Sequence, residues 1–385
     1  MDIEKSEQYL EKFRDDCTNC GDCQTVCSIL NDFRLSPGEI AGQVAYDQVN
    51  NDVLDVIKRC ALCGLCSQEC LEELNPADMF MNAREVLVQR GIITSEEYDV
   101  MLVDRDWNFF TIYRDTFGIQ FEDLKAETYD TLFFPGCTLA SYAPELTRVV
   151  HQWLIGKGYN VGFTEMCCGK PLVSIGLKEC MDQMMNDLRR QMQTAGASRL
   201  ITACPNCLHL LAENLDDIQV LSLYDLMVAK GLQLQGTTRL TIHDSCPDRY
   251  SLQTGEALRQ VLNGYELVEM EHHGNNTICC GSGGIVSMID PDLCFSRARE
   301  RMSEFERSRA DLCVTACMAC SQRLASAANP GEVVHCLELI FELPVDYTQI
   351  QGNIKAMWDG EWGVYNLHRL SQAQIMTRED ETSYD

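Results

Sequence analysis

The pattern of apolar and polar positions divides the chain near residue 131. Before that point, apolar residues recur at helical spacing over 40–46, 53–57 and 77–90, and Gly91 ends the last stretch. The charged opening segment, MDIEKSEQYLEKF, also has helical spacing. The first part of the chain is therefore predicted to be mostly helical.

After residue 131, short apolar runs alternate with longer stretches of helical spacing, and the same order occurs twice. Such alternation predicts parallel sheets covered by helices. Strands are expected at 131–134, 160–163 and 199–202, then at 240–243, 265–270 and 310–315. Helices are expected at 143–157 and 177–195, then at 255–262 and 294–305. The repeat predicts two homologous, Rossmann-like α/β units that arose by duplication.

We therefore predict an α+β multidomain chain. Its expected parts are a helical module at 1–95, a connector at 96–130, α/β domains at 131–236 and 237–345, and a tail at 346–385. The aromatic-rich connector either packs between domains or forms a partner surface. The tail carries Trp358, Trp362 and Tyr365, which suit either a strap over the fold or a docking element. Its acidic end, TREDETSYD, is expected to be disordered.

Composition and charge exclude several classes of protein. The 385 residues are 45% hydrophobic, which is ordinary for a globular protein, and no apolar run approaches the about 20 residues that cross a bilayer. The opening segment does not resemble a signal peptide, so we expect a cytoplasmic protein. A net charge of −27 argues against nucleic acid and anionic lipid as partners.

The chain has 22 cysteines, far more than an ordinary cytoplasmic protein needs. Disulfides would require an oxidising compartment, so this number points to bound metal. Four cysteines have no partner at a regular spacing and are predicted to be small buried apolar residues. These four are Cys180, Cys294, Cys313 and Cys336.

Two N-terminal runs share the spacing C-x2-C-x2-C-x3-C, which is the iron–sulfur run of two-cluster ferredoxins. In that arrangement the fourth cysteine of each run binds the cluster of the other. The predicted first four-cysteine set is Cys17, Cys20, Cys23 and Cys70, and the second is Cys60, Cys63, Cys66 and Cys27. Gly21 and Gly64 are expected at positive φ inside the turns. Zinc is the alternative, and Ser28 and Leu71 replace the usual proline after each run.

Adjacent cysteines followed by glycine occur twice, each with one cysteine upstream and a C-x-x-C downstream. Five thiolates exceed what one zinc ion or one cubane cluster needs. Because strand ends in a parallel sheet share one edge, the fold should bring all of them to the same rim. The first five-cysteine set is Cys137, Cys167, Cys168, Cys204 and Cys207, and the second is Cys246, Cys279, Cys280, Cys317 and Cys320.

These motifs resemble the CCG-domain family, typified by the catalytic subunit of heterodisulfide reductase fused to its small ferredoxin-like subunit. The resemblance covers roughly 10–345 and extends to the iron–sulfur subunits of anaerobic glycerol-3-phosphate dehydrogenase and glycolate oxidase. It implies two cubane and two noncubane [4Fe–4S] clusters, with a disulfide split between the noncubane pair. On this basis Cys167, Cys168, Cys279 and Cys280 are predicted to be catalytic.

The leading hypothesis is an oxidoreductase subunit of anaerobic type that reduces a disulfide or handles a related thiol. Its rival is an electron relay from a flavin-dependent dehydrogenase to quinone or another carrier, and a third possibility is a scaffold or redox sensor. Both five-cysteine sets are complete, whereas many relay relatives have lost ligands in one repeat. No G-x-G-x-x-G is present, so flavin or nicotinamide is assigned to another subunit of a hetero-oligomer.

Smaller features each allow a functional and a structural interpretation. Lys170 and His243 are predicted to contact the cofactor or substrate, with a surface lysine and a structural hydrogen bond as the alternatives. His209 and His335 are predicted to be caps or core residues. The segment 281–284, G-S-G-G, is predicted to pack against a cluster, because it lacks the lysine of a phosphate loop.

Overall fold

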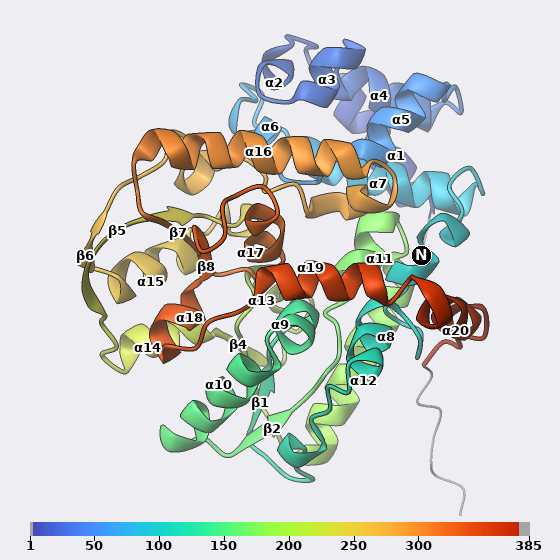
Figure 1. Ribbon diagram of the computed structural model, residues 1–385. Helices are drawn as coiled ribbons and strands as arrows, with labels where there is room; N and C mark the ends of the chain where they lie inside the picture. Colours follow the sequence, from blue (N-terminus) through green and yellow to red (C-terminus); the bar gives the residue numbers. More distant parts are fainter. Residues whose placement is uncertain (1–2, 377–385) are drawn as a thin grey trace, which may run out of the picture.

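The computed structural model describes residues 3–376, so the predicted disorder of TREDETSYD lies outside the described residues. The N-terminal part is helical, as predicted, and stands at the top of Figure 1. Its helices are α1 (Ile3–Asp16), α2 (Asp22–Thr25), α3 (Ser28–Phe33), α4 (Pro37–Ala45), α5 (Asn51–Arg59), α6 (Leu65–Gln68) and α7 (Pro76–Gln89).

Local sequence explains where the longer of these helices begin. Ser36 and Glu39 form a reciprocal capping box at the start of α4. Asn50 caps α5 and Asn75 caps α7, where Pro76 occupies the first turn and needs no hydrogen-bond donor. The connector then contains η1 (Ser95–Met101), α8 (Phe109–Thr116) and η2 (Glu122–Leu124).

Two four-stranded parallel sheets follow, with the strand orders β2-β1-β3-β4 and β6-β5-β7-β8. The first sheet contains β1 (Thr131–Phe134), β2 (Val161–Phe163), β3 (Arg199–Thr202) and β4 (Gln219–Ser222). The second contains β5 (Gln235–His243), β6 (Gly264–Leu267), β7 (Leu312–Thr315) and β8 (Val333–His335). The predicted fold class is confirmed, although β6 ends at Leu267 and not at 270.

Helices cover the sheets in the same order in both halves. The first half has α9 (Cys137–Tyr142), α10 (Pro144–Gly156), α11 (Lys170–Ile175), α12 (Lys178–Ala195), α13 (Pro205–Asn214) and α14 (Leu223–Ala229). The second has η3 (Cys246–Asp248), α15 (Gln253–Val261), η4 (Gly274–Asn276), η5 (Gly283–Met288), α16 (Pro291–Ser308), α17 (Met318–Ala325) and α18 (Cys336–Phe341). The equivalent helices α12 and α16 are both 18 residues long.

The strand register fixes which residues of the two halves correspond. Phe134 pairs with Thr202 in the first sheet, and His243 pairs with Thr315 in the second. Both threonines precede the same Ala-Cys pair, so Phe134 and His243 are equivalent. Thr202 and Thr315 are 113 residues apart, and the same offset carries Lys178, the first residue of α12, to Pro291, the first residue of α16, so each α12 residue has a counterpart in α16.

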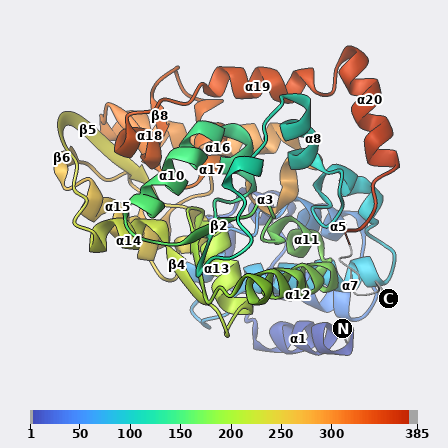
Figure 2. The same ribbon diagram turned by 90° about the horizontal axis from the view of Figure 1, so that it is seen from below.

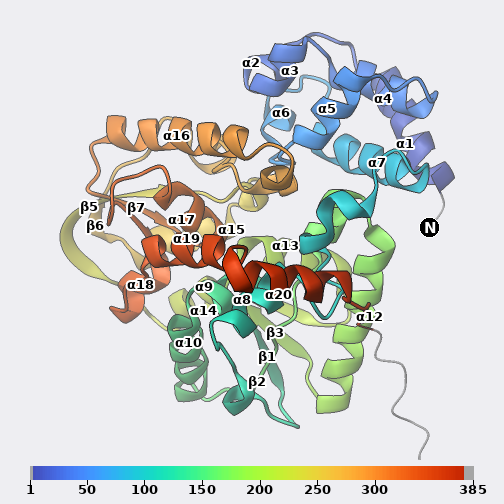
Figure 3. The ribbon, with the colours of Figure 1, turned by 45° about the vertical axis from the view of Figure 1, so that its right-hand side comes forward.

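The hydrophobic core is continuous across the halves. Phe133 and Ile201 of the first sheet share one buried cluster with Ile242 and Val314 of the second. On its other face, the first sheet packs with the helical module in a second cluster that contains Leu132, Phe134 and Leu200. The module is therefore part of the folded body; it lies above α16 in Figure 1, and Figure 3 shows it beside the end of that helix.

The C-terminal segment forms two helices, α19 (Tyr347–Ala356) and α20 (Gly360–Ser371), that lie across the outside of both halves (Figures 1 and 2). Asn353 donates to the Tyr113 hydroxyl at 3.2 Å, and Asn366 donates to Thr116 at 3.2 Å. The segment is thus a strap tied to α8, although Val364 and Leu367 of α20 are exposed. In the part of the chain that the structure describes, no helix is long and apolar enough to cross a membrane.

Glycines at 283 and 284 allow the second half to touch the turn that carries Cys60. A Cβ at Gly284 would lie 2.1 Å from the Cys60 carbonyl oxygen, and one at Gly283 would lie 2.3 Å from that of Ala61. The sequence predicted that the segment 281–284 packs against a cluster. In the structure, Gly283 and Gly284 pack against the backbone of residues 60–61.

Gly284→Ala is expected to destabilise the protein by about 1–3 kcal/mol more than Gly118→Ala, because overpacking adds to the cost of the positive φ. Both glycines have φ +66°, but nothing lies within 4 Å of a Cβ at Gly118. Thermal unfolding of the two variants measures the difference. Equal effects would show that the contact at Cys60 is unimportant.

Candidate metal centres

The first four-cysteine set surrounds one cavity, lined by Cys17, Cys20, Cys23 and Cys70 together with Gly21. Cys70 comes from the other run, so the structure places the cysteines in the exchanged arrangement expected from the spacing. Gly21 has φ +89°, as predicted for this turn. The cavity is small, 20 Å³, so this set must open slightly to take in a cluster.

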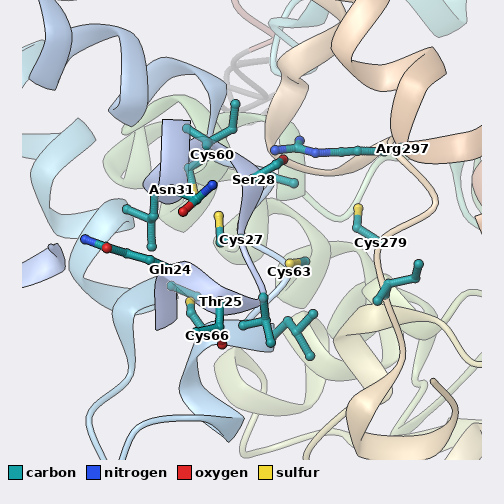
Figure 4. Close-up of a pocket in the computed structure, with 18 of the residues that line it drawn as sticks. Gln24, Thr25, Cys27, Ser28, Asn31, Cys60, Cys63, Cys66, Cys279 and Arg297 are labelled. Atoms are coloured by element: carbon teal, nitrogen blue, oxygen red, sulfur yellow. The ribbon is translucent and has the colours of Figure 1, made fainter. Parts of the chain in front are cut away.

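The second four-cysteine set lines a larger cavity of 410 Å³, again with the exchanged cysteine, Cys27, beside Cys60, Cys63 and Cys66 (Figure 4). Cys279 of the second five-cysteine set lines the same cavity, and Figure 4 shows it on the other side of the cavity from Cys27 and Cys63.

Each five-cysteine set is assembled from three strand ends. Cys137 opens α9 after β1, Cys167 and Cys168 follow β2, and Cys204 and Cys207 flank the start of α13 after β3. The Sγ atoms of Cys137 and Cys167 are 3.7 Å apart. The carboxyl ends of the parallel strands therefore gather the set at one edge, as the alternating pattern predicted.

The second set has the same construction after β5, β6 and β7. The Sγ atoms of Cys280 and Cys320 are 3.1 Å apart, and the Gly281 amide donates to Cys279 Sγ at 3.2 Å. A backbone N–H directed at this sulfur stabilises its thiolate form.

The two five-cysteine sets adjoin each other around one cavity of 210 Å³. All of the first set and four members of the second line it, while Cys279 faces the neighbouring cavity. Hydrogen bonds from Cys207 and from Cys317 of the other half hold the pKa of Cys204 well below its usual value. The Tyr224 hydroxyl contacts the carbonyls of Ala203 and Ala316, at 3.0 and 3.2 Å, and so joins the equivalent strand ends of both halves.

The residues present fit iron–sulfur clusters. Soft thiolates are the preferred ligands of such clusters, and both four-cysteine sets and both five-cysteine sets consist of thiols alone. Burial raises the pKa of Cys23 to about 12 and that of Cys60 to about 11, so these thiols need a bound cation to ionise. A Cβ at Gly136 would lie 3.0 Å from Cys204 Cβ, so this glycine keeps the rim open.

Lys170 and His243, the two residues predicted to contact the cofactor or substrate, both lie beside the five-cysteine sets. Lys170 begins α11 and lines the shared cavity, and burial lowers the pKa of its ammonium group. His243 is buried, and its ring lies within 4.8 Å of Cys280 and Cys320 Sγ. Burial, with the charge of Arg301, lowers the His243 pKa to about 3, so the ring is neutral.

The predictions for the four remaining cysteines and for His209 and His335 are partly confirmed and partly wrong. Cys294, Cys313 and Cys336 are buried as predicted, but Cys180 is only half-buried because it lies on the outer side of α12. His335 caps α18, as predicted. His209 is neither a cap nor a core residue: its side chain lines the shared cavity and lies 3.3 Å from Glu213.

Two arginines near the cysteines were not predicted from the sequence: Arg84, which is buried, and Arg297, which is half-buried. Arg84 of α7 donates to the carbonyls of Ile57, Cys60 and Gly284, and Arg297 of α16 lines the 410 Å³ cavity. Arginine within an amphipathic helix normally marks its exposed face, so neither position carried a signal by itself. Aligning the sequences of α12 and α16 would have singled out Arg297, because its counterpart in α12 is Met184.

Comparison with known proteins agrees with this architecture. The CCG family, described as "Cysteine-rich domain", matches residues 131–212 and 240–325, and the family described as "4Fe-4S dicluster domain" matches residues 16–75. The chain therefore belongs to the CCG-domain iron–sulfur oxidoreductases that also carry a dicluster domain. The family resemblance inferred from the cysteine motifs is confirmed.

Two relatives are similar over most of the chain. One subunit of the dihydromethanophenazine:CoB–CoM heterodisulfide reductase of Methanosarcina mazei is 24% identical over 381 residues, covering 86% of this chain and 92% of the relative. One subunit of the CoM/CoB fumarate reductase of Methanothermobacter marburgensis is 23% identical over 360 residues, covering 84% and 71%. The glycolate oxidase iron–sulfur subunit of Escherichia coli matches only 28% of this chain, at 27% identity.

Proposed function

We propose that this chain is the disulfide-reducing subunit of a hetero-oligomeric, cytoplasmic oxidoreductase. The observation that carries the proposal is the single cavity of 210 Å³ that is lined by all of the first five-cysteine set and by four members of the second. A disulfide R–S–S–R′ takes up two electrons and two protons to give two thiols, so a site that adjoins two one-electron centres suits it. The first relative reported above, which is named a heterodisulfide reductase subunit, supports a disulfide as the substrate.

The 18 cysteines of the four sets are the proposed ligands, and bound [4Fe–4S] clusters would supply one electron at a time. The arrangement suggests a route through the chain. Cys20 is exposed, so the first four-cysteine set is the proposed docking point for an electron-donating flavoprotein or other subunit. The second four-cysteine set comes next, and Cys279 beside it leads to the second five-cysteine set.

Protein side chains around the cavity then bind and orient the substrate. Lys170 and His209 lie on its wall and can attract an anionic group on a thiol or disulfide. Their ammonium and imidazole groups can also donate a proton to a leaving thiolate. Asn206 and Tyr250 add polar contacts on the same wall.

The test is anaerobic turnover of the iron-loaded protein with a reduced viologen as donor. We expect reoxidation of the viologen by low-molecular-weight disulfides that carry anionic groups, and negligible reoxidation by quinone. Rapid reduction of quinone without reduction of any disulfide would instead support the electron relay, which the partial match to the glycolate oxidase subunit favours.

A further inference from the structure

The two five-cysteine sets have the same ligands but different surroundings. In the first half, the residues equivalent to His243, Arg297 and Arg301 are apolar. These counterparts are Phe134, Met184 and Leu188, all of them buried. The duplicated fold is thus chemically asymmetric around its two centres, and β5 and α16 carry these three differences.

Arg297 adds a positive charge where two cysteine sets meet. Its guanidinium lies in the 410 Å³ cavity, near Cys60 and above the space between Cys27, Cys63 and Cys279 (Figure 4). Burial by itself would lower the pKa of Arg297. The nearby cysteine sulfur atoms outweigh this effect and raise the pKa; they belong to Cys279, Cys63, Cys60 and Cys27.

Among residues 3–376 no carboxylate forms an ion pair with Arg297, although Glu300 lines the same cavity. Its Nη2 makes one long hydrogen bond, 3.4 Å, to the Arg59 carbonyl oxygen. Its Nη1 is buried without a hydrogen-bond partner among residues 3–376. By contrast, Arg114, the arginine nearest to Cys137 and Cys167, is paired with Glu165 at 3.2 Å. The arginine beside the first centre is therefore neutralised, whereas Arg297 beside the second is not, and the Lys170 ammonium interacts with Cys168 of the first set and Cys246 of the second and so serves both.

A second and independent feature is the orientation of His243. Arg301 Nε donates to His243 Nδ1 at 3.0 Å, which leaves the proton of the neutral ring on Nε2. Glu304 pairs with Arg301 and holds it in place, so this arginine mainly fixes the ring. His243 Nε2 is buried with no partner among the described residues, and the ring lies close to Cys280 and Cys320.

We propose that Arg297 and His243 make the second five-cysteine centre the higher-potential member of the pair. A nearby cation and an N–H donor to sulfur both stabilise the more negative, reduced state of a thiolate-bound cluster. An electron arriving beside Cys279 would then rest on the second centre before moving to the first. The inference depends on cluster binding by both sets, as proposed above, but not on the disulfide chemistry.

The test is an anaerobic redox titration of the iron-loaded protein, followed by EPR. Cys137→Ser and Cys246→Ser variants identify which signal belongs to which centre. We expect the second centre to be reduced at higher potential than the first. Arg297→Met, which installs the residue of the first half, should lower the reduced-to-oxidised ratio of the second centre about tenfold at fixed potential, equal to about 59 mV for one electron.

Arg299→Met is the matched control, since it removes an equal charge from the exposed side of α16 and should leave both potentials unchanged. His243→Phe should lower the potential of the second centre by itself, and it keeps the test decisive if Arg297→Met does not fold. A first centre that titrates above the second, or equal shifts in Arg297→Met and Arg299→Met, would overturn the inference alone. Absence of iron from both five-cysteine sets would overturn the proposed function as well.

Discussion

Cys279→Ser is expected to lower disulfide reduction by about 10³-fold or more, as removal of a residue that acts within a catalytic unit does. This cysteine belongs to the second five-cysteine set and also faces the cavity of the second four-cysteine set. Its loss should therefore block electrons between the two sets, while the four-cysteine centres remain reducible. Freeze-quench EPR of the variant with a viologen donor measures both effects.

Cys167→Ser should abolish turnover in a different way. Cys167 lines the shared cavity with its Sγ 3.7 Å from that of Cys137, and, unlike Cys279, it does not line the 410 Å³ cavity of the second four-cysteine set. The second five-cysteine centre should thus still be reduced in this variant. Cys180→Ser is the control, because Cys180 lies outside every set. Wild-type rates in Cys279→Ser or Cys167→Ser would refute the shared-cavity mechanism.

Arg84→Ala is expected to lower the free energy of unfolding by about 3–5 kcal/mol, because each of several carbonyls left buried and unpaired costs about 1–3 kcal/mol. The guanidinium donates to Ile57 and Cys60 in the helical module, to Ser174 in the first half and to Gly284 in the second. Burial lowers the pKa of Arg84, and neutral carbonyls alone satisfy its donors. Its removal leaves those carbonyls buried and unpaired.

The same variant should slow electron transfer, because Arg84 fixes Cys60 relative to Gly284. Thermal unfolding and the rate of reduction of the five-cysteine centres measure the two effects. Arg90→Ala is the control: Arg90 is also partly buried, but it contacts only Val44, Ala45, Asp47 and Glu7 of the helical module. An equal loss in both variants would show that Arg84 does not join the three parts.

The sequence predicted most of the strands and the grouping of the cysteines, because both depend on local spacing. The C-x2-C-x2-C-x3-C runs place three thiols on one turn, and a parallel sheet brings residues after different strands to one edge. The position of Cys279 against the second four-cysteine set was not predictable. It depends on how Gly283 and Gly284 dock onto residues 60–61, which no periodicity encodes.

Buried arginines escaped sequence reasoning for a related reason. Arg84 is satisfied by carbonyls from three distant segments, so no partner carboxylate at a helical spacing marks it. His209 was misassigned because the cavity wall that it joins is built from both halves and the helical module. The strap formed by α19 and α20 likewise depends on contacts with α8, more than 200 residues earlier in the chain.

The central claim is that both five-cysteine sets hold iron–sulfur clusters that face one substrate cavity. Anaerobic iron and sulfide analysis, combined with EPR in the presence and absence of an added thiol, tests it most directly. The account predicts about 16 irons per chain, four for each of four clusters, and an EPR signal that the thiol alters. Zinc at the five-cysteine sets, or a fully loaded protein with a signal indifferent to thiol, would contradict it.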